Sequence, residues 1–363
     1  MKLAVCIFTA IALSVVPIFA VEEDVAQAQY EAFGIDELVR ASPATDVEFD
    51  EGISLNEGLG KIWDKMRSSA GEIFTGGLRC VMTLVLVSFL TSSIGALFSE
   101  YGSAVKSATA LSGALACTAS AFGSITSVIS LGREFISRTD VFLKSLIPTL
   151  AAAEASCAGA GAAVAKAGAT LLFSNVLISI INYVFMPLVY VNIFLAAANA
   201  ATENGTLQRI SGLLSKVISG TLKILLGAYV SYITVSGISA SGVDKLGLRA
   251  AQLAAGTVPV VGGMISNVSE TVIAGALLMK NAIGVFGMLT VLSVFATPFL
   301  TMAINYIMFK FAACVASPLI GGKISELSDR FAESFGQVLA MCTSVALLVF
   351  ISIVASMKGV GVI

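Results

Sequence analysis

The sequence predicts an all-α, multi-pass helical integral membrane protein with an internal duplication and re-entrant or broken helices. Apolar residues make up 57% of the 363 residues, charged residues only 12%, and the mean hydropathy is +0.94. Soluble domains carry about 25% charged residues, so lipid is expected to solvate most of this chain. Charge is also unevenly distributed, because residues 21–78 hold 13 acidic and 4 basic side chains whereas 79–363 are mildly basic.

Residues 1–20 are predicted to be a signal peptide or a signal anchor. Lys2 precedes an apolar run, and Ala20 comes shortly before the acidic residues Glu22, Glu23 and Asp24, which is the layout of a secretory leader. Ile18 weakens the cleavage site, so the uncleaved anchor stays open as an alternative. In either case the acidic segment, residues 21–77, is expected to be extracytoplasmic.

The acidic segment is predicted to end in an amphipathic helix. Apolar residues recur there at three- and four-residue steps, and they are Leu59, Ile62, Trp63, Met66, Ala70, Ile73 and Phe74. Trp63 beside lysine and arginine suits a membrane interface. Packing of this helix on a partner protein is an equally good interpretation, because periodicity does not distinguish lipid from protein.

Six stretches are apolar and long enough to cross a bilayer, which takes about 20 residues. They are Cys80–Phe98, Ser107–Leu131, Ala167–Ala201, Ile224–Val243, Ala282–Phe309 and Gln337–Met357. The first two form a region of first transmembrane helices, residues 78–140. We expect a loop with Arg133, Arg138 and Lys144 to follow them on the extracytoplasmic side, which conflicts with the usual excess of positive charge in cytoplasmic loops.

The remaining sequence is predicted to contain two membrane repeats, residues 141–250 and 251–363. Pro148 and Pro259 are 111 residues apart, and so are Pro187 and Pro298. Each copy has a hairpin rich in Pro, Gly and Ala, a long apolar run broken by proline, an amphipathic helix and a final span. The hairpins, Ser145–Ala165 and Ala250–Val268, are typical of broken or re-entrant helices, which lie at membrane depth only when buried in protein or lining water.

Paired broken helices in two repeats indicate a transport pathway. The candidate pathway residues are Glu154, Pro148, Pro259, Gly262 and Gly263. Glu154 is the acidic residue inside the first hairpin, and a charge at membrane depth is a functional candidate because burying it unpaired is costly. The alternative is that Glu154 pairs with Lys166 or reaches water at a loop.

The amphipathic helices of the two repeats are candidate interface helices. Arg209, Lys216 and Lys223 are spaced by seven and share one side of a helix, and Lys323 and Arg330 hold matching places in the second copy. Such helices suit the headgroup layer, with the cations extending toward water. Contacts between subunits of a ring are the alternative function.

The composition argues against an enzyme. Histidine is absent, which removes the commonest general base and metal ligand, and no phosphate-binding loop or protease motif is found. No catalytic, cofactor-binding or metal-binding residue is predicted, and no basic tract indicates nucleic-acid binding. The single cysteines are expected to be small packing residues. Asparagines within the apolar runs, Asn175, Asn182, Asn192, Asn199 and Asn305, are expected to bond between helices.

Four stretches resemble the stage III sporulation protein AE family, namely Ser130–Pro148, Thr257–Met264, Lys280–Gly284 and Lys323–Ser325. The resemblance covers about residues 55–363 together with the leader. It implies a multi-pass protein of the mother-cell membrane that faces the forespore. It also implies a channel complex for endospore formation, built with the other stage III sporulation A proteins, including an ATPase, and with stage II sporulation protein Q on the forespore side.

The leading functional hypothesis is therefore a non-enzymatic, permease-like subunit of that secretion-like channel complex, in contact with membrane lipid. Two alternatives remain. The duplicated broken helices also suit an autonomous secondary transporter of a small solute, and the amphipathic helices suit a membrane scaffold for complex assembly.

Overall fold

The computed structural model describes residues 55–97, 103–158, 160–202, 205–256, 262–320 and 322–358, and most side chains within 57–97, 105–155, 161–202, 205–233, 283–315 and 325–356. All of these residues are helical, which confirms the predicted all-α class. The elements are α4 (Leu55–Leu97), α5 (Ser103–Ala158), α6 (Ala160–Ile180), the π-helix η2 (Ile181–Phe185), α7 (Met186–Thr202), α8 (Gly205–Gly256), α9 (Gly262–Ile320) and α10 (Gly322–Lys358). The predicted leader and most of the acidic segment lie outside the described residues.

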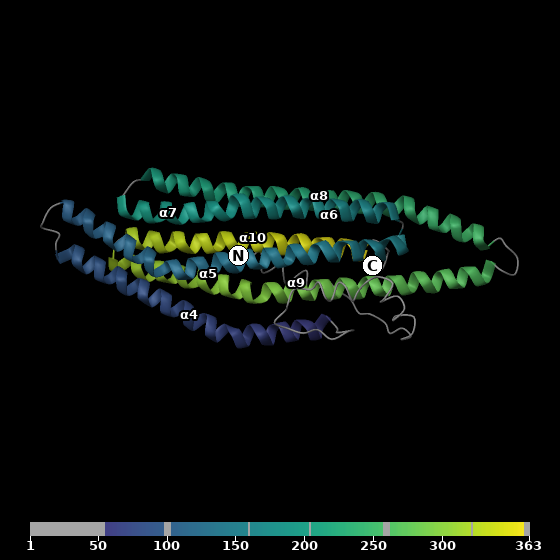
Figure 1. Ribbon diagram of the computed structural model, residues 1–363, viewed down its shortest axis with the longest axis horizontal. Coiled ribbons are helices and arrows are strands. Elements are labelled where there is room, and N and C mark those ends of the chain that lie inside the picture. The colour runs from purple at the N-terminus through teal and green to yellow at the C-terminus, as the bar shows by residue number, and fades with distance from the viewer. Residues whose placement is uncertain are drawn as a thin grey trace.

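The helices form an elongated bundle in which successive long helices run in opposite directions along the long axis (Figure 1). The path α6–η2–α7 behaves as one rod, and α8 lies beside it along one edge, while α4 follows the opposite edge. Helix α10 packs against α9, α5, α7 and α8 and thus occupies the middle of the bundle.

Six helical segments are long and apolar enough to span a membrane. They are Glu57–Leu97, Ser107–Ala155, Ala163–Thr202, Gly205–Ile233, Ile283–Val315 and Ser325–Ser356, and each contains or overlaps one of the six predicted spans. The most apolar stretches of the last two are 67% and 61% buried, whereas those of the first and fourth are 17% buried. Helices α9 and α10 are therefore the core, and α4 and α8 expose most of their apolar surface.

The helix break that we expected at Pro148 is not present, because α5 continues through this proline to Ala158. Proline lacks the N–H that would bond to the carbonyl four residues earlier. The Oγ1 of Thr149 donates to the carbonyl of Ser145 at 3.0 Å, and Pro148 itself is exposed. The carbonyl that loses its usual N–H donor is that of Lys144, so this bond does not replace the missing one. Burial of Ile147 and Leu150 on either side of the proline keeps the helix continuous. The chain reverses its direction between α5 and α6 instead.

The prediction of a loop with Arg133, Arg138 and Lys144 is also wrong, since these residues lie within α5. Phe135, Ile136, Phe142 and Leu143 alternate with them at helical spacing and are fully buried, so packing on the core keeps this charged stretch helical.

The other prolines have different surroundings. Pro187 follows the π-helical turn η2, in which the N–H of Met186 bonds to the carbonyl of Ile181. A π-turn is a recognised way to absorb a local irregularity within a helix, so the interruption predicted near Pro187 is a widened turn. Pro298 lies within α9, and Pro259 lies outside the described residues.

Each predicted amphipathic helix is joined to the span that follows it. The helix expected around residues 59–74 is the first half of α4, and those with Arg209 and Arg330 are the first halves of α8 and α10. They are therefore not separate surface helices, because each helix continues without interruption from its amphipathic half into its apolar half. The domain boundaries remain predictions, although α4 passes through residue 77 and α5 through residue 140.

Candidate functional site

The buried ion pair of Glu154 and Lys166 is the first of two polar clusters in the bundle. Glu154 lies near the end of α5 and Lys166 near the start of α6, so the reversal of the chain between these two helices brings them together. The Nζ of Lys166 lies 2.8 Å from Oε1 of Glu154 and donates also to the carbonyl of Ala355 on α10 at 2.8 Å. The side chain of Glu154 is only 7% exposed and that of Lys166 only 13%. The expected pairing of these two residues is thus present.

A hydroxyl network continues from Lys166 into the core. Thr170 Oγ1 donates to the carbonyl of Lys166 at 2.9 Å, and it lies 3.1 Å from the Tyr229 hydroxyl and 3.3 Å from Ser352 Oγ. A hydroxyl has one hydrogen to donate, so Thr170 accepts from both Tyr229 and Ser352. We call Glu154, Lys166, Thr170, Tyr229 and Ser352 the Glu154 cluster, and it joins α5, α6, α8 and α10.

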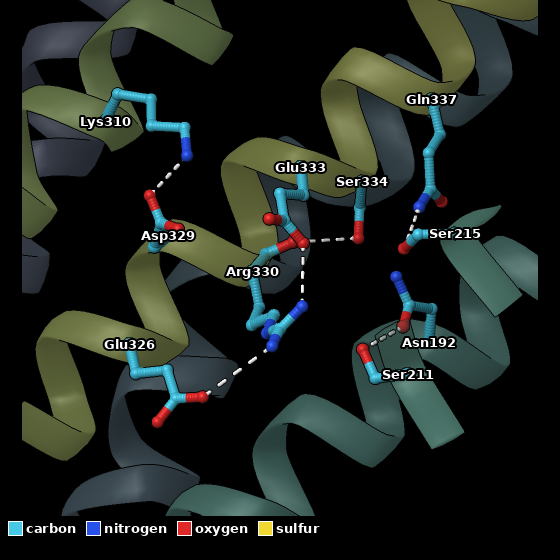
Figure 2. Close-up of polar contacts among 10 residues, drawn as sticks. All are labelled: Asn192, Ser211, Ser215, Lys310, Glu326, Asp329, Arg330, Glu333, Ser334 and Gln337. Carbon is cyan, nitrogen blue, oxygen red and sulfur yellow. Dashed lines mark hydrogen bonds and ion pairs between the residues drawn. The ribbon is translucent and has the colours of Figure 1, made fainter. Parts of the chain in front are cut away.

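The second cluster surrounds Arg330 near the start of α10 (Figure 2). Its guanidinium lies 2.9 Å from Glu333 and 3.8 Å from Glu326, one turn on either side, and its side chain is 18% exposed. Asp329, the residue before Arg330, pairs with Lys310 of α9. We call these five residues the Arg330 cluster. It contains three carboxylates and two cations, and all five side chains are partly buried.

Uncharged polar groups connect the Arg330 cluster to α7 and α8. Gln337 Nε2 donates to Ser215 Oγ at 2.7 Å, and Ser211 donates to the amide oxygen of Asn192 (Figure 2). Asn192 Nδ2 and Gln337 Oε1 are buried without a partner within the protein. A cavity of about 10 Å³ lies beside Ser211 and Arg330. The cavity walls come from α7, α8 and α10 and include Asn199, Gln208, Ser211, Glu326 and Arg330. This space is on the scale of one buried water molecule.

Neither cluster is built like a catalytic centre. Both are networks of ion pairs and hydrogen bonds between helices, four in the Glu154 cluster and two in the Arg330 cluster, with no nucleophile beside a base. Within the described ranges, no group of three or more His, Cys, Asp or Glu side chains is placed to hold a metal ion. What the arrangement can do is hold charge inside a membrane bundle, either to fix the packing or to form part of a polar route.

The sequence as a whole matches the family described as stage III sporulation protein AE, over residues 49–359. The chain belongs to the stage III sporulation protein AE family. It is 29% identical over 234 residues to the stage III sporulation protein AE of Bacillus subtilis (strain 168), which covers 64% of this chain and 59% of that relative. The aligned part thus spans less than two thirds of the relative. No solved structure gives a match to this chain.

In this member of the family, the structure brings together only some of the predicted pathway residues. Glu154 is buried, whereas Pro148, six residues earlier, is on the surface of α5. Gly262 and Gly263 form the first turn of α9, and Pro259 lies outside the described residues. The pathway that these residues were predicted to line therefore remains a prediction, with Glu154 as its buried member.

The predicted interface residues also separate into two groups. Arg209, Lys216 and Lys223 are exposed along α8. Beside them lies an exposed apolar row that includes Leu213, Val217 and Ile224. Arg330, by contrast, is held by carboxylates within the second cluster, and the side chain of Lys323 lies outside the described residues.

Two of the predicted asparagine contacts between helices are present. Asn192 accepts from Ser211 of α8, and Asn305 of α9 accepts from Ser124 of α5 at 2.9 Å. Asn175 is exposed, so no packing role follows for it. Cys117 and Cys342 are buried as expected for packing residues, but Cys314 is exposed. The Thr170 network was missed, although hydroxyls in apolar helices are a signal for such contacts.

Proposed function

We propose that this chain is a non-enzymatic, permease-like membrane subunit of the secretion-like channel complex that joins mother cell and forespore during endospore formation. The observation that carries the proposal is the buried Glu154–Lys166 pair at the junction of α5, α6 and α10. Ionisable groups buried between spanning helices are costly, and they usually mark a pathway or a conformational element. Membership in a sporulation family supplies the biological setting.

In this proposal the protein lies in the mother-cell membrane facing the forespore, with residues 21–54 in the space between the two membranes. Residues 55–77, which we also expected there, belong to α4, whose candidate span begins at Glu57. Its partners are the other stage III sporulation A proteins, including an ATPase that supplies energy, and stage II sporulation protein Q across that space. The exposed cations of α8 provide contacts with neighbouring subunits, because Lys216 and Lys223 lie within a span where lipid solvates them poorly.

Deletion of the gene in the sporulating organism tests the proposal. We expect spore formation to stop after engulfment, and we expect a tagged full-length chain to co-purify with the ATPase and other stage III sporulation A proteins. Heat-resistant spores at the parental yield would contradict the proposal. Complementation with the unmodified gene is the control for effects on neighbouring genes.

An autonomous secondary transporter is the second candidate. The observation in its favour is the repeated order of helices, since α6–η2–α7 followed by α8 matches α9 followed by α10, each pair joined by a short turn. The purified chain in liposomes separates the two functions. Solute uptake by the isolated chain supports the transporter, and dependence on the other complex proteins supports the channel subunit.

A further inference from the structure

A charged stretch of α5 lies at the depth of the apolar core. Two contacts between α5 and the antiparallel rod α6–η2–α7 bracket it. At one end, Gly132 of α5 lies close to Met186 of α7, since a methyl group added at Gly132 would be 3.5 Å from Met186 Cε. At the other end, Glu154 pairs with Lys166. The 22 residues between these contacts rise by about 33 Å, close to the thickness of a bilayer core.

The two rods have opposite surfaces between these contacts. No charged residue occurs between Lys166 and Glu203, and exposed positions there include Leu172, Val176 and Tyr183 at 61%, 40% and 82% exposure. Along α5, the exposed positions include Arg133, Glu134, Ser137, Arg138 and Lys144, which we call the polar flank. Behind both surfaces lie uncharged stretches of α9 and α10, with Phe135 against Phe295 and Leu146 against Gly287.

Helix α4 extends the polar surface at the same depth. A methyl group on Gly58 would meet Leu289, and one on Gly77 would meet Met308, so residues 58–77 follow the uncharged run of α9. Asp64, Arg67 and Glu72 are exposed along this part of α4. Helices α4 and α5 also pack against each other, so the two polar surfaces are neighbours.

We propose that the polar flank of α5, continued by α4, lines a water-filled passage at membrane depth, while α6–η2–α7 faces lipid at the same depth. Several exposed charges in contact with lipid would be strongly unfavourable. In water they cost little, and the pairs Arg138–Glu134 at 2.5 Å and Lys144–Asp140 at 2.7 Å are of the exposed i,i+4 kind. This inference rests on the proposed channel function and names its hydrophilic wall.

The chemistry of the wall indicates what the passage takes. Three cations and two carboxylates alternate along α5 from Arg133 to Lys144. On α4, Asp64, Arg67 and Glu72 add charges of both signs. Such a mixed surface suits water-soluble solutes of either charge, unlike the single-sign rings that select ions strongly. No site for a specific solute follows from such a surface.

Cysteine labelling in membranes of sporulating cells tests the inference. A full-length chain with its six native cysteines replaced by alanine receives one new cysteine at a time. Lys144→Cys and Arg138→Cys probe the polar flank, and Val176→Cys and Tyr183→Cys are the controls at matching depth on the lipid side. The probe is a charged, membrane-impermeant maleimide, which needs a hydrated thiolate to react.

We expect both flank positions to react roughly tenfold or more faster than both controls, because thiolate forms in water and not in lipid. Equal reactivity at all four positions would place this depth outside the bilayer and overturn the inference. Protection of both flank positions would overturn it too, since lipid or protein would then cover them. Two flank positions are used because one variant alone could misfold, and spore yield reports folding of each.

Failure of the proposed function gives a different result. If the flank is labelled and the controls are protected, but a bulky label leaves spore yield unchanged in the intact complex, the water-facing surface stands and the channel role fails. If labelling blocks spore formation at the flank, but not in a control chain that keeps the exposed Cys314 as its one cysteine, both the water-facing surface and the channel role stand.

Discussion

The ammonium of Lys166 lies 2.8 Å from Oε1 of Glu154 and 2.8 Å from the carbonyl oxygen of Ala355, so one cation joins α5, α6 and α10. Removal of one member of a buried pair leaves the other charge uncompensated, which is more costly than removal of both. A comparison of single and double variants can therefore test whether the pair is buried.

Glu154→Gln should lower the free energy of unfolding by about 3 kcal/mol, because Lys166 keeps its charge and loses its carboxylate. The double variant Glu154→Gln with Lys166→Met should recover most of this loss. Thermal unfolding in detergent, followed by circular dichroism, measures both. A single variant as stable as the parent would contradict the buried pair.

The same two variants separate packing from a pathway role. If Glu154 acts in conduction, the double variant should regain stability while spore yield stays low, since no charge returns to the site. Spore counts after heat treatment check this, with the amount of protein in the membrane as the control. Equal recovery of stability and spore yield would limit Glu154 to packing.

Thr170→Val should destabilise the bundle by about 1–3 kcal/mol, because the hydroxyls of Tyr229 and Ser352 lose their shared acceptor while buried. Thr126→Val is the matched control, since Thr126 donates to carbonyls of its own helix at Phe122 and Gly123. Thermal unfolding of both variants should separate them. Similar midpoints would mean that the network contributes little.

The fold class and the six spans could be predicted because they depend on length and apolar content, which the sequence displays directly. The Glu154–Lys166 pair could also be predicted, since the two residues are 12 apart in and directly after the predicted first hairpin. Prolines were misleading. Pro148 did not end its helix, because a break depends on whether packing on neighbouring helices compensates, which is not visible in the local sequence.

The contacts between distant helices could not be predicted. Gln337 and Ser215 are 122 residues apart, and their hydrogen bond depends on how far α10 and α8 are displaced and rotated relative to each other. The charged stretch from Arg133 to Lys144 was wrongly predicted to be a loop, also because its partners are distant in the sequence. Its apolar residues cover α9 and α10, and only the partner helices reveal that one face is buried.

Gly132→Ala should destabilise the protein by about 1–3 kcal/mol. The new methyl group would lie 2.5 Å from Val338 Cγ1 and 3.5 Å from Cys342 Sγ, and overpacking of a full core has costs of this size. Gly123→Ala, on the same helix with open space around it, is the control and should stabilise by up to about 1 kcal/mol. Unfolding midpoints that shift in the same direction would contradict the close contact of α5 and α10.

Charge reversal on α8 tests whether its exposed cations contact other subunits. In the triple variant Arg209→Glu, Lys216→Glu, Lys223→Glu, we expect little change in the unfolding midpoint of the isolated chain, because all three side chains are exposed. Association should weaken, since like charges at an interface cost several kcal/mol. Co-purification with the other complex proteins and the mass of the native assembly measure this. The charge-conserving variant Arg209→Lys, Lys216→Arg, Lys223→Arg should assemble normally. Assembly of the reversed variant at the parental level would show that these cations face lipid headgroups or water and not a neighbouring subunit.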